Sequence, residues 1–257
     1  MTVLGATSAR LTRLRRLVRH RRYRDAEGAV AVEGPHAIGT ALDCGAEFEA
    51  LYVSGGPATA DVADLAAGAG VAVFEVEREL LDDIADSRTP QGVLAVVRPV
   101  VAVLHDVVGC ARVVLLDGVQ DPGNAGAIVR TAAAAGFDAI IAGSATADLW
   151  GPKAIRASAG TIFAIAAAQR VETGEALEAL GAAGHVRWAA TADGETAHDD
   201  VEASDRLTLV LGSEAHGVSA AGLARIDRGV YIAMAAPVES LNVAVTAGVL
   251  LYQLRDR

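Results

Sequence analysis

The chain has 257 residues, of which 52 % are hydrophobic and only 4 % aromatic, and its formal net charge is −10. This composition supplies a core of alanine, valine, leucine and isoleucine and excludes an intrinsically disordered chain. No run approaches the roughly 18 apolar residues of a membrane-spanning helix, and no apolar signal segment follows the first arginines, so we expect a cytoplasmic protein. The two cysteines form no CxxC pair and the six histidines show no ligand spacing, so no metal site is expected.

Positive charge is concentrated near the start of the chain. Eight arginines and no acidic residue lie between Arg10 and Arg24, and the rest of the chain is strongly acidic. This asymmetry indicates a local phosphate-binding segment on a body that repels nucleic acid, with a solvated helix face as the alternative. The predicted RNA contacts in this segment are Arg10, Arg13, Arg16, Arg19 and Arg22.

In chain order, the first half alternates short helices and strands. Helices are predicted over residues 8–20, 33–45, 61–67 and 78–86, and strands over 51–54, 71–76 and 91–99. This alternation predicts a small α/β sandwich domain over residues 1–99. Residues 100–111 are predicted to be a linker, because Pro99 and Gly109 flank a short apolar stretch.

The second half, residues 112–257, alternates strands and helices in the manner of a doubly wound parallel sheet. Strands are predicted over residues 112–117, 138–143, 161–166, 186–191, 207–212 and 230–234. Helices are predicted over 152–158, 173–183 and 241–254, together with one that Asn124 caps and Gly136 ends. In such folds ligands bind at loops beyond the carboxyl ends of the strands.

The first segment that indicates chemistry is DPGNAGAIVRTAAAAG, residues 121–136. Its glycines permit a tight strand-to-helix turn, and the helix N-terminus offers free N–H groups to an anion. Arg130 lies six residues after Asn124, and we expect both to face the same side; outward solvation of Arg130 is the alternative. The segment lacks the GxGxxG and GK[ST] patterns of nucleotide-binding loops.

Two further segments follow later in the chain. In LVLGSEAHGVS, residues 209–219, Glu214 lies in a glycine-flanked loop after an apolar strand, where ligands bind. His216 in the same loop is expected to be structural. In the segment 231–254, Asn242 is predicted in the first turn of an apolar helix. The polar residues before that helix indicate that its N-terminus lines a site, and local hydrogen bonding of Asn242 at the helix end is the alternative.

In this order the three segments resemble the motifs of the SpoU/TrmH family of RNA 2′-O-methyltransferases: Asn-x5-Arg-Thr-Ala, Gly-Ser-Glu-x-x-Gly and Pro-Met-x4-Glu-Ser-Leu-Asn-Val. The resemblance implies a trefoil-knotted α/β methyltransferase domain over residues 112–257, an S-adenosylmethionine site inside the knot, and a homodimer. The first half, through EGPHAIGTAL and TPQGVLAVV, resembles the ribosomal-protein-like RNA-binding domain of many members. Thiostrepton-resistance-type methylases share this two-part layout.

The resemblance also implies roles for individual residues. The catalytic set is Asn124, Arg130, Glu214, Ser240 and Asn242. The cofactor contacts, largely through backbone groups, are Thr191, Ala192, Gly212, Ile232, Met234 and Leu241. Lys153 and Arg156 are expected to contact RNA phosphates, with surface helix charges as the alternative. Because a guanidinium stays protonated, Arg130 is expected to clamp a phosphate and stabilise the developing alkoxide; the family's proposal of a general base remains the alternative.

The sequence departs from the family pattern at one place. Ala233-Met234 stands where the family has Pro-Met, and the loop that follows lacks the usual glycine, so the shape of the cofactor pocket can differ. The predicted function is methyl transfer from S-adenosylmethionine to a ribose 2′-hydroxyl of structured RNA, with ribosomal RNA favoured over transfer RNA. The alternatives are a catalytically silent RNA-binding member and a dinucleotide-dependent oxidoreductase, which lacks its phosphate fingerprint here.

Overall fold

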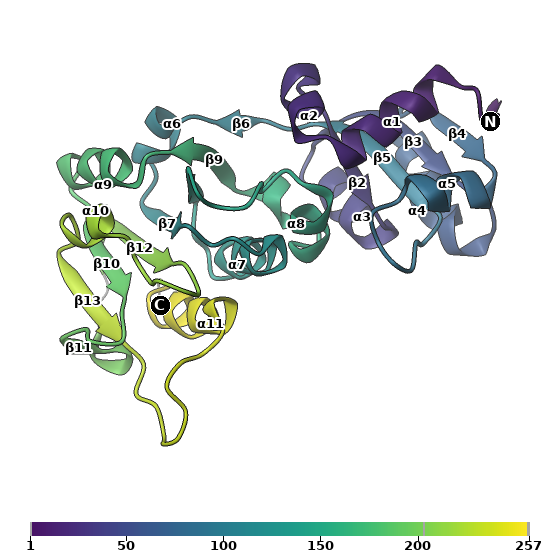
Figure 1. The fold of residues 1–257 in the computed structure, drawn as a ribbon. Coiled ribbons are helices and arrows are strands. Elements are labelled where there is room, and N and C mark those ends of the chain that lie inside the picture. Colours follow the sequence, from purple (N-terminus) through teal and green to yellow (C-terminus); the bar gives the residue numbers. More distant parts are fainter. Residues whose placement is uncertain (1, 203, 256–257) are drawn as a thin grey trace. The chain divides into compact units, whose positions relative to one another are not determined.

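The computed structural model describes residues 2–202 and 204–255 and divides the chain into two compact units (Figure 1). The first unit comprises the chain up to Val100 together with Trp150–Ala164. The second comprises Val101–Leu149 and the chain from Ile165 onward. The segment Trp150–Ala164 therefore leaves the second unit after one strand, packs in the first unit, and returns before the next strand.

The first unit is an α/β sandwich around a mixed sheet of order β1-β4-β3-β5-β2. Its strands are β1 (Thr2–Leu4), β2 (Val30–Glu33), β3 (Glu47–Val53), β4 (Val73–Val76) and β5 (Val93–Arg98). Its helices are α1 (Ala9–Arg19), α2 (Arg21–Glu27), α3 (Pro35–Asp43), α4 (Pro57–Gly68), α5 (Arg78–Ile84) and α8 (Pro152–Ala157), followed by the 3₁₀ turn η1 (Thr161–Ala164). β5 pairs antiparallel with β2 and β3, whereas β4 pairs parallel with β1 and β3.

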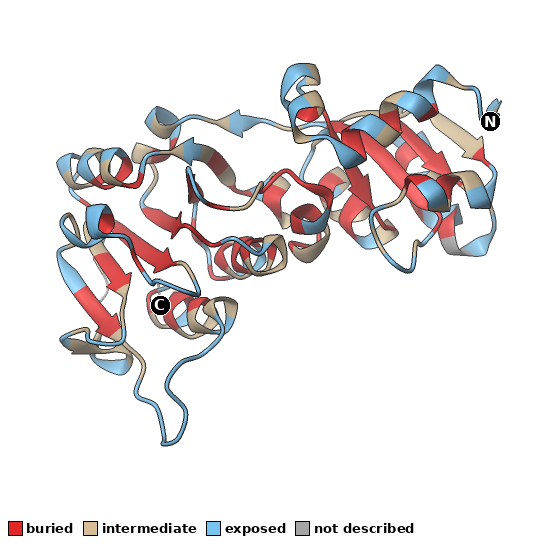
Figure 2. Ribbon diagram, viewed as in Figure 1, coloured by how far each residue is buried: buried red, intermediate tan, exposed pale blue. Residues whose placement is uncertain are grey.

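Strand alternation explains why both faces of this sheet are covered. Ala31, Ala50 and Leu94 share a core cluster with Leu14 and Leu17 of α1. Because successive strand side chains point to opposite faces, the buried residues between them face the other way, where α3 and α4 pack. Figure 2 shows the result, with buried residues along the strands and exposed residues on the outer sides of the helices.

The segment after α8 differs from its prediction. Residues 161–166 were expected to form a strand, but Thr161–Ala164 form a 3₁₀ turn and strand β9 starts only at Ala166. Gly160 has a left-handed φ of 82°, and a Cβ there would collide with the backbone carbonyl of Ala37. The close approach of two backbones in the first unit therefore fixes a turn where the apolar sequence favoured a strand.

The second unit is a parallel sheet of order β11-β13-β10-β12-β7-β8-β9-β6 with helices on both faces. Its strands are β6 (Val101–Ala102), β7 (Arg112–Asp117), β8 (Ala139–Gly143), β9 (Ala166–Val171), β10 (Val186–Ala190), β11 (Thr196–Ala197), β12 (Leu207–Gly212) and β13 (Arg228–Tyr231). Its helices are α6 (Leu104–Val108), α7 (Pro122–Ala134), α9 (Thr173–Ala182), α10 (Ala220–Leu223) and α11 (Val243–Gln253), with the 3₁₀ turn η2 (His198–Asp200). The predicted α/β fold class is confirmed, and the predicted linker contains β6 and α6.

Two helices of the second unit start differently from their predictions. α7 begins at Pro122 and its N-cap is Asp121, whose Oδ1 accepts from the backbone N–H of Asn124 at 3.0 Å. The prediction that Asn124 caps this helix is therefore wrong; a Pro at the first helical position sets the start earlier. α11 begins at Val243, so Asn242 is its N-cap instead of a residue of the first turn.

Within residues 2–202 and 204–255, none of the helices combines the length and the apolar character that crossing a membrane requires.

Candidate functional site

A chain of side-chain hydrogen bonds joins the three motif segments of the second unit. The amide nitrogen of Asn242 donates to the amide oxygen of Asn124 at 3.2 Å. The amide nitrogen of Asn124 in turn donates to Oε1 of Glu214 at 2.7 Å. Asn124 is 90 positions from Glu214 and 118 positions from Asn242 in sequence, yet the three residues meet at the carboxyl edge of the sheet. The predicted convergence of the three segments is therefore present in the structure.

Local structure orients each member of this chain. The Oδ1 of Asn242 caps α11 by accepting from Ala244 N at 2.9 Å, which leaves its NH2 group for Asn124. The Glu214 loop is closed by two backbone hydrogen bonds between Ser213 and Gly217, each 2.9 Å long. Gly217 has a left-handed φ of 67°, which glycine adopts without steric cost. The side chains are thus held by caps and turns.

Arg130 does not join this chain. It is exposed on α7, and none of the hydrogen bonds or ion pairs of the described residues includes it. The expectation that Arg130 and Asn124 share a helix side is wrong, because six residues at 100° each place them about 120° apart. Arg130 remains available to a ligand, while Asn124 is already bonded to protein groups.

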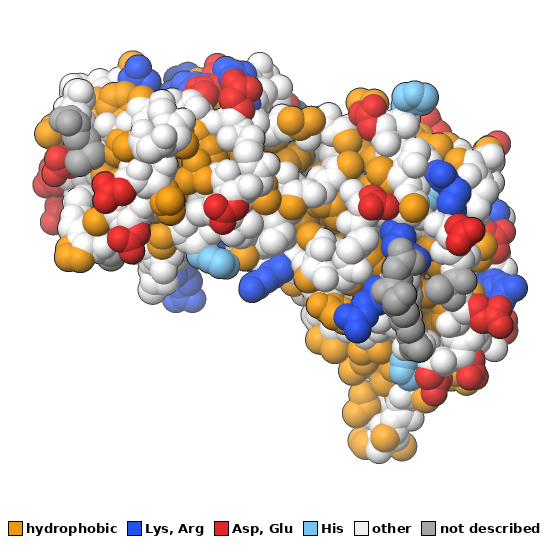
Figure 3. Space-filling model, turned by 180° about the vertical axis from the view of Figure 1, so that it is seen from behind, with side chains coloured by type: hydrophobic (Ala, Val, Ile, Leu, Met, Phe, Trp, Pro, Cys, Tyr) orange, Lys and Arg blue, Asp and Glu red, His pale blue; other side chains and the backbone are white. Residues whose placement is uncertain are grey.

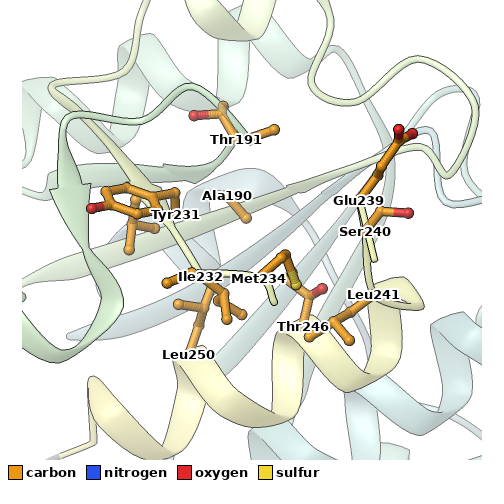
Figure 4. A pocket seen from close by; sticks show the side chains of 13 residues that line it. Ala190, Thr191, Tyr231, Ile232, Met234, Glu239, Ser240, Leu241, Thr246 and Leu250 are labelled. Carbon is orange, nitrogen blue, oxygen red and sulfur yellow. The ribbon is translucent and has the colours of Figure 1, made fainter. Parts of the chain in front are cut away.

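A cavity of about 550 Å³ lies beside the start of α11. Five predicted cofactor contacts line it, namely Thr191, Ala192, Ile232, Met234 and Leu241, and Ser240 lines it as well. Figure 4 shows Met234, Leu241 and Thr246 grouped on one side, with Thr191 on the other and Glu239 next to Ser240 at one end. Leu241 is followed directly by Asn242, so one segment both lines the cavity and enters the hydrogen-bonded chain.

Sequence reasoning missed several residues that line this cavity. Tyr231, Thr246 and Leu250 contribute to its wall, as does Glu239, which belongs to the Glu-Ser-Leu-Asn motif but was not assigned to the cofactor. Thr246 and Leu250 lie four residues apart on α11, so helical periodicity from Asn242 could have placed both on the cavity side. Gly212, by contrast, was predicted to bind cofactor but is not among the residues that line the cavity.

The loop after β10 separates this cavity from a second one. Residues 190–192 line both, and the second cavity, of about 450 Å³, also includes Glu195 and His216. Glu195 fastens the loop, because both of its carboxylate oxygens accept from the N–H of Gly229, at 3.0 and 3.1 Å. A Cβ on Gly194 would come within 2.8 Å of the Gly229 backbone, so only glycine permits this approach. The wall between the cavities is therefore tightly fixed.

The predicted RNA contacts of the first unit fall into two groups. Arg13 is bonded to Glu27 and Glu49, at 2.8 and 2.6 Å, and these bonds raise the pKa of its guanidinium. Burial alone would raise the pKa of Glu49, but Arg13 and Arg98 lower it overall. Such paired charges stabilise the unit.

The other four predicted contacts, Arg10, Arg16, Arg19 and Arg22, are exposed. Arg10 lies over the ring of Phe74, 4.6 Å from its centre, and Arg16 lies over Tyr23. Arg19 donates to the carbonyl of Asp83, and Arg22 has no bonded partner among the described residues. These side chains leave guanidinium edges open to solvent.

Lys153 and Arg156 lie on α8 and therefore in the first unit. Lys153 is exposed, whereas Arg156 pairs with Glu33 at 3.1 Å and with Asp86 at 3.0 Å. Glu33 is buried and also accepts from the backbone N–H groups of Asp86 and Ser87. Arg156 thus neutralises a buried carboxylate.

Comparison with known families decides the relationship of the chain. A family model described as the SpoU rRNA Methylase family matches residues 111–252, more than half of the chain. The chain belongs to the SpoU methylase family. A second family model, the MRM3-like substrate binding domain, matches residues 9–95.

Similar proteins include the 23S rRNA (guanosine(2553)-2′-O)-methyltransferase RlmP of Bacillus subtilis (strain 168), 32 % identical over 225 residues that cover 87 % of each chain. Among solved structures, an AdoMet-bound rRNA methyltransferase from Sinorhizobium meliloti superposes with a TM-score of 0.85 at 28 % identity, covering 98 % of this chain and 97 % of that one. The SpoU methyltransferase AviRb from Streptomyces viridochromogenes, in complex with AdoMet, gives the same TM-score and identity, covering 96 % and 97 %.

Proposed function

We propose that this SpoU methylase transfers a methyl group from S-adenosylmethionine to a ribose 2′-hydroxyl of RNA. The observation that carries the proposal is the segment from Glu239 to Asn242. Its first residues line the large cavity, and its last residue enters the hydrogen-bonded chain to Asn124 and Glu214. A methyl donor in the cavity and a ribose beside these hydrogen-bonded side chains would therefore lie next to each other, and such placement lowers the barrier to transfer by about 7–11 kcal/mol in the best cases.

The cavity fits the methyl donor. Ile232, Met234 and Leu241 offer aliphatic contacts for an adenine ring, while the carboxylate of Glu239 suits a cationic group. Pockets for cofactors are usually apolar with a few polar groups that fix orientation. When bound, S-adenosylmethionine supplies an electrophilic methyl group. Thr191 and Ala192 would hold it from the side opposite α11, largely through backbone groups.

The remaining motif residues would act on the ribose. Asn124, Glu214, Ser240 and Asn242 would form the wall around it. Arg130, which is exposed, would clamp the neighbouring phosphate and stabilise the developing alkoxide, since its guanidinium stays protonated at ordinary pH. The proton would leave to phosphate or water. A general-base role of Arg130 is the other candidate.

The RNA would bind through the first unit. Its match to a substrate-binding family and the exposed guanidinium groups of Arg10, Arg16, Arg19 and Arg22 support this role. Ribosomal RNA is the proposed substrate, because the relative from Bacillus subtilis is named for 23S rRNA and the structural relative from Sinorhizobium meliloti for rRNA. Arg13, Lys153 and Arg156 were predicted to contact RNA as well; Arg13 and Arg156 would do so only at the expense of their ion pairs.

A homodimer in the cytoplasm is the proposed state of the protein. Val245 and Tyr252, seven residues apart on one face of α11, are 52 % and 45 % exposed. The loop between β13 and α11, which projects in Figure 1, is mostly apolar in Figure 3, and Val238 within it is 52 % exposed. Apolar area of this kind on a helix and an adjacent loop supports burial against a second copy.

The trefoil knot implied by the family also remains a proposal. One close backbone approach between distant segments of the second unit is in keeping with it, that of Gly194 to Gly229. Chain segments that cross at such short range need glycine on at least one side.

The test is transfer of tritiated methyl groups to total RNA from a strain that lacks the protein, followed by mapping of the modified ribose. Arg130→Ala is expected to lower kcat by about 100-fold or more while cofactor affinity stays nearly unchanged, because Arg130 does not line the cavity. Retained turnover in this variant would refute the role of Arg130. Cofactor binding without any transfer by the unmodified protein would instead indicate a catalytically silent member.

A further inference from the structure

Asp117 is a nearly buried acidic residue at the carboxyl end of β7, with 9 % of its surface exposed. Its Oδ1 accepts from the hydroxyl of Thr173 at 2.6 Å, and its Oδ2 accepts from the backbone N–H of Ser219 at 2.7 Å. No arginine, lysine or histidine among the described residues forms an ion pair with it. A buried carboxylate is costly unless it accepts strong hydrogen bonds, so its two donors define what it does.

The two donors belong to different segments. Thr173 is the first residue of α9, directly after the loop that follows β9. Ser219 follows the Glu214 loop and caps α10, its Oγ accepting from Gly222 N at 3.2 Å. A Cβ on Gly222 would lie 3.2 Å from Oδ2 of Asp117, so the carboxylate fills the space beneath α10. One side chain thus ties the end of the Glu214 loop to the strand below it.

The start of the same loop is fixed independently. Gly212, the last residue of β12, is the register partner of Asp117 in the parallel ladder between β12 and β7. Between these two anchors, Ser213 and Gly217 bond to each other and Glu214 projects to Asn124. The loop is therefore held at its start by the sheet and at its end by Asp117.

We propose that Asp117 is a positioning residue for methyl transfer: its carboxylate fixes the Ser213–Ser219 segment so that Glu214 meets Asn124. The proposal rests on the role of Glu214 in the proposed function. Thr173 does not share this role. Its hydroxyl donates to Oδ1 of Asp117, whereas the Glu214 loop is bonded to Oδ2 through the N–H of Ser219.

The first experiment compares Asp117→Asn with Thr173→Val. In D117N the N–H of Ser219 faces either the NH2 group or a neutral amide oxygen, and each holds it more weakly than the carboxylate does. The Glu214 loop therefore loosens, and kcat for tritiated-methyl transfer to large-subunit ribosomal RNA falls at least about tenfold. The Kd for S-adenosylmethionine changes less than about threefold, because no hydrogen bond of Asp117 reaches a residue lining the larger cavity. T173V keeps kcat within about threefold although its melting temperature falls.

Hydrogen exchange gives a second readout. Amide exchange of residues 213–219 is expected to rise in D117N and to stay unchanged in T173V. If D117N and T173V lose kcat and thermal stability in equal measure, Asp117 is merely structural and the proposal fails. Wild-type kcat in folded D117N also overturns it.

A second pair of variants applies if D117N does not fold. Ser219 has a φ of −63°, the value that proline fixes, so Ser219→Pro removes the N–H without altering φ. Ser219→Ala lacks the same capping hydroxyl but keeps the N–H. A lower kcat in S219P than in S219A supports the proposal, and equal kcat values contradict it. Glu214→Ala distinguishes failure of the proposed function from failure of the inference about Asp117. Wild-type transfer by E214A would refute the proposed role of Glu214. Impaired transfer by E214A together with unimpaired transfer by S219P would refute only the role of Asp117.

Discussion

Asn124 occupies a position that needs a side-chain amide. Its oxygen accepts from Asn242 and its nitrogen donates to Glu214, so both ends of one planar group are used. A carboxylate accepts only, and a hydroxyl is too short to reach both partners. The direction of the chain is set at Asn242, whose oxygen is already occupied by the N-terminus of α11. The amide chain thus transmits the orientation of one helix end to the Glu214 loop.

Asn124→Asp tests this arrangement. The substitution replaces the N–H donor with a second carboxylate 2.7 Å from Glu214, and like charges at that distance push the loop away. We expect kcat to fall by about 100-fold with a small change in melting temperature, because Glu214 and Asn242 are exposed and Asn124 is only half-buried. Asp121→Asn is the matched control, since Asn caps a helix as well as Asp does. Wild-type turnover in N124D would contradict a role in catalysis for the hydrogen bonds that join Asn242, Asn124 and Glu214.

For single residues, the sequence predicts which ones belong to the site better than it predicts what they contact. The three motifs identified Asn124, Glu214 and Asn242 because the family pattern fixes residue types and spacing. The position of Arg130 relative to Asn124 was misjudged, although the 100° step of a helix was enough to exclude it. Asp117 gave no signal, because it ends an apolar strand and its partner Ser219 lies 102 residues away. Its role depends on a strand pairing that no local pattern encodes.

Among secondary-structure elements, the buried parallel strands were the most predictable. β7 and β12 begin and end where the predicted strands 112–117 and 207–212 do, because each is a continuous apolar run in the middle of the sheet. β9 was misplaced, since Gly160 forces a turn through a tertiary contact. α2 was not predicted from its arginine-rich sequence; it buries only Arg24, which donates to carbonyls of α1. The extent of β9 and the existence of α2 therefore depend on contacts with residues distant in the sequence.

The junction of β10 and β12 holds a histidine whose protonation should weaken the fold. His185 is 4 % exposed, and its Nε2 lies 3.2 Å from the guanidinium of Arg206. Because a guanidinium only donates, Nε2 must accept, which assigns the proton to Nδ1 facing Thr208. Burial, together with the charge of Arg206, lowers the pKa of His185 below its usual 6.5.

The sign of the pH effect follows from that pKa. The unfolded chain binds a proton at His185 near pH 6.5 and the folded chain only at lower pH, so stability is complete above pH 6.5 and declines below it. We expect urea unfolding to show a loss of at most about 1.4 kcal/mol per pH unit from this residue. His185→Gln should remove that component, whereas His105→Gln, which replaces an exposed histidine of α6, should retain it. An unchanged slope in H185Q would contradict the assignment.

On the scale of the whole molecule, some arginines form ion pairs within the fold and others remain exposed to solvent. A net charge of −10 opposes RNA binding, yet the arginine-rich segment supplies exposed guanidinium groups on α1 and α2. The sequence predicted this segment as one RNA-binding element. The structure separates it, because Arg13 is bonded to two glutamates while Arg22 is open to solvent. Composition reveals where charge lies along a chain, but only the fold reveals which charges are already paired.

That division predicts how RNA affinity depends on salt. Each phosphate that a guanidinium neutralises releases counterions. The slope of log Kd plotted against log salt concentration should therefore increase by about 0.9 for each such contact. Replacing Arg16, Arg19 and Arg22 together by Ala should therefore reduce the slope by about 2 to 3 and weaken binding uniformly across RNA sequences. Filter binding of ribosomal RNA between low and physiological salt measures it.

Arg13→Ala is the matched control, because it removes the same charge from the same helix. Its guanidinium is committed to Glu27 and Glu49, so this variant should leave the salt slope within about 0.5 of the wild type. It should instead lower the free energy of unfolding by about 1–2 kcal/mol, the range for half-buried charged hydrogen bonds. If R13A and the triple variant reduce the slope per arginine equally, pairing within the fold does not decide which arginines meet RNA, and the phosphate contacts must be sought over the whole segment.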